Sequence, residues 1–138
     1  MGYRSDVAYT IRFKDVGAMT VFIAEAQGKG LQPALDECTV NHRKLQINFL
    51  AEDVKWYDSF PIVQMHNSLV ELAEDWCEGD RHRHTRETGD TGGPVEYKLG
   101  VIVAHVGEEP DDNGERADGD YDWDWLRVQR RVAPDWEI

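Results

Sequence analysis

A strand-to-helix junction at residues 55–61, Lys-Trp-Tyr-Asp-Ser-Phe-Pro, constrains the fold more than any other stretch of this chain. Apolar residues follow it at intervals of three and four, the spacing of one face of an α-helix. Pro61 suits the first helical turn, where no backbone donor is needed, and Asp58 or Ser59 is expected to cap it. The apolar face consists of Ile62, Met65, Leu69, Leu72, Ala73 and Trp76. The pattern predicts a helix over about residues 60–77 that packs one side against a core.

Strands are predicted wherever apolar residues alternate with polar ones. Val7, Tyr9, Ile11 and Phe13 give the clearest such alternation. Asp15 then begins a helix that ends at Gly28-Lys29-Gly30. The other predicted elements are a short strand around residues 37–40, a strand through 45–51, the helix at 60–77, a strand over 97–106 and a last strand over about 121–132. The order is therefore strand, helix, strand, strand, helix, strand, strand.

That order predicts one α+β domain over residues 1–138. The arrangement expected is a ferredoxin-like split βαββαβ sandwich with one added C-terminal strand, a mostly antiparallel sheet and both helices on one face. Residues 79–93 and 107–120 are polar, rich in glycine or acid, and lack an apolar period. They are predicted to be mobile loops.

Two helices cover only one face of such a sheet, so the other face is expected to meet a partner. The alternation in each strand sends Leu50, Ile102, Trp123, Trp125 and Arg127 to that open face. A bulge near Trp125 would instead return the tryptophans to the core. Tryptophan, isoleucine and arginine together are typical of interface hot spots. A partner protein, or a second copy in a homodimer, is therefore expected to cover the face.

The charge of the chain narrows the class of partner. Its 27 acidic and 15 basic residues give a net charge of −12, which disfavours binding to nucleic acid. Nine carboxylates gather between Glu108 and Asp124, a stretch named here the acidic segment. Asp111, Asp112 and Glu115 within it are predicted to attract a basic partner. The one basic block, residues 81–86, is predicted to contact an acidic partner or the chain's own acidic segment.

Metal binding is a second interpretation of the acidic segment. Its carboxylates and amide fall at calcium-loop positions with a glycine at the sixth place. The candidate ligands are Glu109, Asp111, Asn113, Glu115 and Asp120. The first ligand is Glu instead of Asp, and the flanks have the pattern of strands where an EF-hand has helices. A solvated hairpin loop is therefore the favoured interpretation.

Other chemistry finds little support in the sequence. Cys38 and Cys77 lack the paired spacing of a disulfide framework or zinc site and are expected to stay reduced. His82 and His84 sit among arginines that would repel a metal cation. No phosphate loop, nucleophile elbow or His-Glu-x-x-His motif is present. No catalytic residue and no cofactor are predicted.

Three short motifs resemble a family of small, uncharacterised tailed-bacteriophage proteins. They are Tyr-Arg-Ser-Asp-Val at 3–7, Lys-Trp-Tyr-Asp-Ser at 55–59 and Gly-Glu-Glu-Pro-Asp-Asp at 107–112. The resemblance implies a virus-encoded protein and carries over no functional residue. No run of about 18 apolar residues and no secretory signal is found, so the host cytoplasm is the expected location and no membrane contact is expected.

Two classes of function follow. The sequence favours a non-enzymatic interaction protein that binds a host or phage macromolecule, for example to take over the host or to inhibit a defence factor. The alternative is a metal-dependent enzyme, of hydrolase or nuclease type, that uses the carboxylates of the acidic segment.

Overall fold

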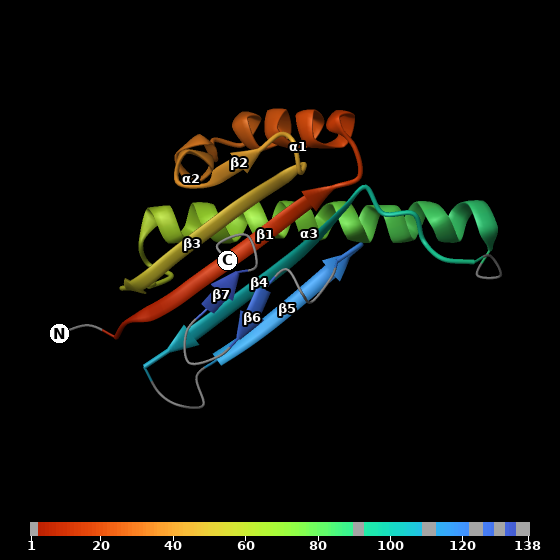
Figure 1. The fold of residues 1–138 in the computed structure, drawn as a ribbon. Coiled ribbons are helices and arrows are strands. Elements are labelled where there is room, and N and C mark those ends of the chain that lie inside the picture. Colours follow the sequence, from red (N-terminus) through yellow and green to blue (C-terminus); the bar gives the residue numbers. More distant parts are fainter. Residues whose placement is uncertain (1–2, 90–92, 109–112, 122–125, 129–131, 135–138) are drawn as a thin grey trace.

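An antiparallel sheet backed by helices forms the body of the protein (Figure 1). The computed structural model describes residues 3–89, 93–108, 113–121, 126–128 and 132–134. The strands of the sheet are β1 (Ser5–Phe13), β2 (Thr39–Asn41), β3 (Gln46–Val54), β4 (Leu99–Gly107) and β5 (Asn113–Gly119), in the order β2-β3-β1-β4-β5. The helices are α1 (Val16–Gly28), α2 (Gln32–Asp36) and α3 (Pro61–Thr88). Every neighbouring strand pair is antiparallel, so the predicted α+β class with an antiparallel sheet is confirmed.

The alternation in β1 separates two packed clusters. Val7, Tyr9, Ile11 and Phe13 belong to the main core, together with buried residues of all three helices. Ala8, on the other face of β1, belongs to a smaller cluster with residues of β4. The predicted start of α1 is also confirmed, because the Asp15 carboxylate accepts a hydrogen bond of 2.8 Å from the Ala18 backbone N–H.

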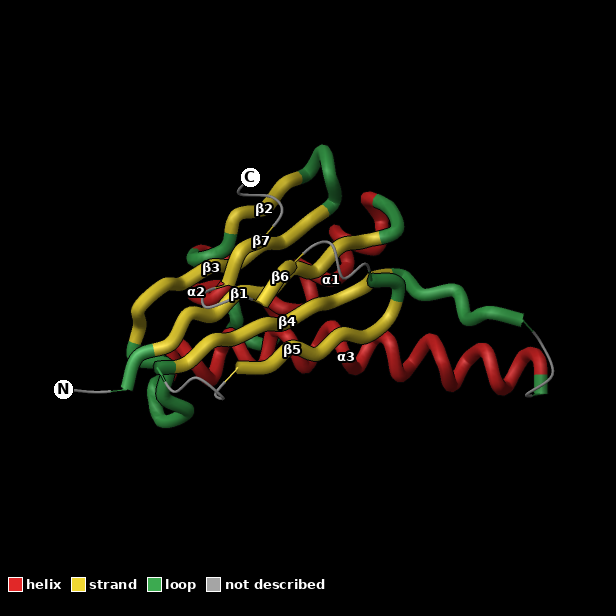
Figure 2. Tube along the Cα trace, turned by 60° about the horizontal axis from the view of Figure 1, so that its bottom comes forward, coloured by secondary structure: helices red, strands yellow, loops and turns green. Residues whose placement is uncertain are grey.

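Helix α3 is longer than predicted, and a different residue caps its start. The sequence predicted a loop from residue 79, but α3 continues to Thr88, and its last part extends past the sheet (Figures 1 and 2). Gly89 ends it in the left-handed conformation, with its N–H donating to Thr85 O. At the other end the cap residue is Phe60, without a side-chain hydrogen bond, so the expected cap at Asp58 or Ser59 is wrong.

The extension of α3 gives a testable consequence at Gly79. A Cβ atom at this helical position would meet nothing within 4 Å. We expect Gly79→Ala to raise the free energy of unfolding by about 1 kcal/mol, because alanine costs less backbone entropy in a helix. Urea unfolding measures the change. Gly89→Ala is the control and should be destabilising, because Gly89 has a φ of 63°. A Gly79→Ala variant that is less stable than the wild type would contradict a continuous helix.

The C-terminal part of the chain is rearranged relative to the sequence prediction. Residues 113–119, predicted as part of a loop over 107–120, form the edge strand β5 beside β4. The single last strand predicted over about 121–132 is absent from the described residues. Short strands β6 (Leu126–Val128) and β7 (Val132–Pro134) instead pair with each other as a separate two-stranded sheet.

The open face of the sheet is covered by the chain itself. β6 and β7 contact β1 and β4, and in Figure 1 they lie in front of these strands whereas α3 passes behind. Ala8, Thr10, Ile102 and Ala104 are fully buried there. The prediction that a partner or a second copy must cover Ile102 is therefore wrong, because the final residues of the same chain fold back over it. Among the described helices none is long and apolar enough to cross a membrane.

Candidate functional site

A cavity of about 460 Å³ lies between the first half of α3 and the sheet. It is named here the Trp56 cavity. Its lining combines aromatic, aliphatic and ionisable side chains. They are Tyr3, Ser5, Val7, Tyr9, Trp56, Tyr57, Asp58, His66, Asn67, Val70, Val103, His105 and Arg116. A concave site of this size, lined by both apolar and polar side chains, is the most suitable hollow for a ligand or partner group.

A chain of buried hydrogen bonds forms the inner wall of this cavity. The Tyr9 hydroxyl lies 2.5 Å from His66 Nδ1, and His66 Nε2 lies 2.7 Å from Glu37 Oε1. Tyr9 and His66 are each 1% exposed, whereas the Glu37 side chain is 50% exposed. The Glu37 carboxylate, the His66 imidazole and the Tyr9 hydroxyl therefore follow one another from the surface into the core, which is the order of groups in a proton relay.

The protonation of this chain follows from its surroundings. Burial raises the pKa of Tyr9 well above its usual value, so the hydroxyl keeps its proton and donates it to His66 Nδ1. Burial lowers the pKa of His66, against the opposing effect of Glu37. The neutral ring then carries its proton on Nε2 and donates it to Glu37. Because both ring nitrogens are occupied, His66 links two elements of the fold and has no lone pair left for a substrate.

The two thiols are also held in their unreactive form. Burial raises the pKa of Cys38 to about 11 and that of Cys77 to about 12, so both stay protonated at neutral pH. Neither forms a disulfide, as the sequence predicted.

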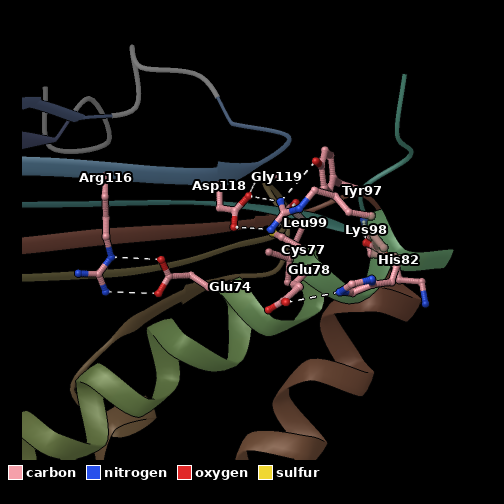
Figure 3. Close-up of polar contacts among 12 residues, drawn as sticks. Glu74, Cys77, Glu78, His82, Tyr97, Lys98, Leu99, Arg116, Asp118 and Gly119 are labelled. Atoms are coloured by element: carbon pink, nitrogen blue, oxygen red, sulfur yellow. Dashed lines mark hydrogen bonds and ion pairs between the residues drawn. The ribbon is translucent and has the colours of Figure 1, made fainter. Parts of the chain in front are cut away.

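Two ion pairs join β5 to α3 beside the cavity. Arg116 donates from Nε and Nη2 to the two oxygens of Glu74, at 3.1 and 3.4 Å (Figure 3). Arg81 donates to both oxygens of Asp118, and this contact raises the pKa of Arg81. The predicted contact between the basic block and the chain's own acidic segment is thereby confirmed at Arg81. These pairs also explain why β5 lies against α3.

The residues at the strand-to-helix junction form the mouth of the cavity. The Trp56 ring packs on Phe49 and His66, with centroids 5.6 Å from each. The Tyr57 hydroxyl accepts a hydrogen bond of 2.6 Å from the Tyr3 backbone N–H. The Asp58 backbone carbonyl accepts a hydrogen bond of 2.9 Å from the Gln64 side chain. The junction therefore anchors α3 through its aromatic rings.

A larger hollow, of about 970 Å³, lies at the far end of β1, next to residues 94–97. Its polar lining consists of exposed or half-buried side chains such as Lys14 and Asp120. The Trp56 cavity is the stronger candidate because Tyr9 and His66 in its wall are buried and convergent.

Comparison with known proteins gives no identity. No family model, curated protein or solved structure matches this chain. The function is therefore inferred from the geometry of the described residues.

The residues predicted to bind a partner differ in how far they are exposed. Leu50 is half-buried beside the second cluster, and Ile102 is fully buried. Glu115 is exposed on β5, and Arg127 lies in β6. Trp123, Trp125, Asp111 and Asp112 lie outside the described residues. Leu50, Ile102 and Glu115 share one face of the sheet, since the register places Leu50, Ala8, Ala104 and Glu115 side by side across it.

The calcium-loop interpretation is contradicted where the structure describes it. Asn113 begins β5 and Asp120 follows its end, so the two residues lie about 20 Å apart along an extended strand. One ion contacts ligands within about 2.5 Å and cannot reach both. Glu109 and Asp111 lie outside the described residues. Among the described residues, no group of three acidic, histidine or cysteine side chains could hold a metal ion.

The His82–His84 pair is likewise not a metal site. Both residues lie on α3, where positions two apart point to different sides of the helix. His82 faces Glu78 at 3.5 Å. The sequence did not predict a helix at these histidines, because Gly79 and the charged residues after it interrupt the apolar spacing of a helix.

Proposed function

We propose that this chain is a bacteriophage-encoded, non-enzymatic interaction protein that binds a basic surface of a host or phage protein. One observation carries the proposal: three arginines of α3 and β5 are paired with acidic residues of the same chain. Arg81 pairs with Asp118, Arg83 with Asp80 and Arg116 with Glu74. Each ion pair cancels one positive and one negative charge. The net charge of −12 is therefore carried by the remaining residues of the chain.

The inert state of the reactive groups supports a binding role. The Cys38 and Cys77 thiols are protonated, and the His66 ring has both nitrogens occupied. Asn113 and Asp120 are too far apart to share one metal ion, which counts against the calcium-loop arrangement. The surplus of acidic side chains on the chain favours the attraction of a basic partner.

The viral origin and the site of action in the host cytoplasm rest on the three motifs at 3–7, 55–59 and 107–112. A protein of this kind would act by occupying a basic surface that a host or defence factor uses. We further propose that the fold is a ferredoxin-like split βαββαβ sandwich with its helices on one face and β5 as the added strand. The strand order β2-β3-β1-β4 supports this arrangement.

The acidic segment is expected to set the rate of association. The variant Asp111→Asn, Asp112→Asn and Glu115→Gln should slow association with the partner by about 10-fold at low salt, while the dissociation rate changes little. The partner is first captured from a lysate of infected bacteria. It is then purified, and its binding is measured by surface plasmon resonance at several salt concentrations.

The matched control changes the same number of charges on α3. Glu71→Gln, Asp75→Asn and Glu87→Gln replace three exposed acids far along the chain from the acidic segment. Association should slow less in this variant. Equal slowing in both variants would contradict a role for the acidic segment, and association that is independent of salt would contradict the proposed function.

A further inference from the structure

The Trp56 cavity has the chemistry of a pocket for a cationic side chain. Resting on the proposed function, we propose that it receives one arginine or lysine side chain of the basic partner. The cavity measures about 460 Å³, which accommodates a long side chain with room for its solvation. Aliphatic, aromatic and acidic groups line successive parts of it, and each suits one part of such a side chain.

The sheet and helix supply an apolar surface for the methylene groups. Val7 and Val103 lie on neighbouring strands, where Tyr9 is the register partner of Val103, and Val70 faces them from α3. Lysine and arginine commonly bury their methylene groups against apolar surface while the charged group stays near water. The three valines therefore form the part of the cavity that the stem of the side chain would contact.

The aromatic groups at the mouth suit the charged end. Trp56 and Tyr57 both line the cavity, and the electron-rich face of such a ring attracts a cation. Their positions are fixed before binding, since the Trp56 ring packs on Phe49 and the Tyr57 hydroxyl is hydrogen-bonded to Tyr3 N. Walls that are already ordered lower the entropic cost of binding.

The charges around the cavity favour a cation over an anion. Arg116 is already bound through two nitrogens to Glu74, which cancels its charge. His66 is neutral because burial lowers its pKa. The exposed Asp58 carboxylate also lines the cavity and makes no hydrogen bond or ion pair within the described part of the chain. The net charge of −12 on the whole chain also favours the approach of a cation over that of an anion.

The test uses short peptides that differ only in one side chain. Acetyl-Gly-Gly-X-Gly-Gly-amide is prepared with X as arginine, lysine, citrulline or norleucine, the last two being neutral analogues. Binding to the full-length protein is followed by NMR, through the indole N–H resonance of Trp56. We expect the arginine or lysine peptide to bind in the millimolar range, and the neutral analogue of the better one to bind at least 10-fold more weakly. Equal binding of charged and neutral peptides would overturn the proposal.

Two variants test the location. Val103→Phe fills the cavity and should abolish the shifts of Trp56, whereas Val21→Phe, at a position 58% exposed on α1, should leave them unchanged. Asp58→Asn should weaken binding about 3-fold or more without altering the unfolding transition, so it remains informative if Val103→Phe does not fold. Binding that survives both Val103→Phe and Asp58→Asn would overturn the proposal.

The same variants separate this proposal from the proposed function. If the purified partner still binds the Val103→Phe variant with wild-type affinity but loses affinity at high salt, the cavity is not its contact and the acidic surface remains the site. If no basic protein binds with salt dependence, the proposed function fails, whatever the peptides do.

Discussion

Gly100→Ala is expected to destabilise the protein by about 3 kcal/mol or more. Gly100 pairs with Gly119 across β4 and β5, and the chain turns back closely over it. A Cβ atom on Gly100 would lie 1.9 Å from Asp120 O and 2.3 Å from Asp120 C. Both are backbone atoms, so the overlap is relieved only by moving β5 away from β4. This movement of β5 would also weaken the ion pairs between β5 and α3.

Urea unfolding measures this effect, and Gly28→Ala is the matched control. A Cβ atom at Gly28, at the end of α1, would meet nothing within 4 Å. That variant should be within about 1 kcal/mol of the wild type. If Gly100→Ala unfolds at the same urea concentration as Gly28→Ala, the close approach of Asp120 to β4 is contradicted.

The central strands and the start of each long helix could be predicted because their signals are local. The residues of β1 alternate between two faces of the sheet: Val7, Tyr9, Ile11 and Phe13 pack in the main core, whereas Ala8 belongs to the second cluster. The end of α1 at the glycine-rich turn is equally local, since Gly30 has a positive φ. The apolar spacing after Pro61 likewise shows where α3 begins.

The second half of α3 could not be predicted because its support is polar. Residues 79–88 have no apolar period, and Gly79 disfavours a helix. The helix is supported instead by the pair of Arg83 with Asp80, and by the Asp80 carboxylate, which accepts from Lys98 N. Contacts of this kind become visible only when the fold brings residue 98 next to the helix.

Strand β5 was missed for a related reason. Its sequence, Asn-Gly-Glu-Arg-Ala-Asp-Gly, lacks the branched and aromatic residues that favour strands. It is extended because the free edge of β4 offers backbone hydrogen bonds. Arg116 and Asp118, two residues apart, then reach the same side and pair with Glu74 and Arg81.

The candidate site was foreseen only in part. The junction at residues 55–61 was recognised in the sequence as the start of a packed helix, and the structure adds that Trp56, Tyr57 and Asp58 line a cavity. Tyr3 and Arg116 could not be assigned to it, because the pairing of β1, β4 and β5 brings them there from both ends of the chain. The link from Glu37 through His66 to Tyr9 depends on the same tertiary packing.

His66 is expected to make the stability of the protein depend on pH. Burial lowers its pKa in the folded state below the usual value of 6.5, so the unfolded chain takes up a proton first as the pH falls. The contribution of neutral His66 is therefore complete above about pH 7 and is lost as the pH decreases through 6.5 toward the folded pKa. Below the folded pKa no further loss from this residue is expected.

The variant His66→Leu isolates this effect. At pH 8 it should lower the free energy of unfolding by about 2 kcal/mol, because the buried Tyr9 hydroxyl loses its nitrogen acceptor and keeps only the weak contact with Cys38 Sγ at 3.4 Å. At pH 5 the gap to the wild type should narrow, since leucine has no proton to take up. Adding Tyr9→Phe should recover up to about 1 kcal/mol at pH 8, because the hydroxyl, left with only its weak contact to Cys38 Sγ, is removed. Urea unfolding of the three proteins between pH 5 and 8 provides the measurement. A constant difference in stability across that pH range would show that His66 titrates alike in the folded and unfolded chain. A double variant less stable than His66→Leu would contradict the hydrogen bond between Tyr9 and His66.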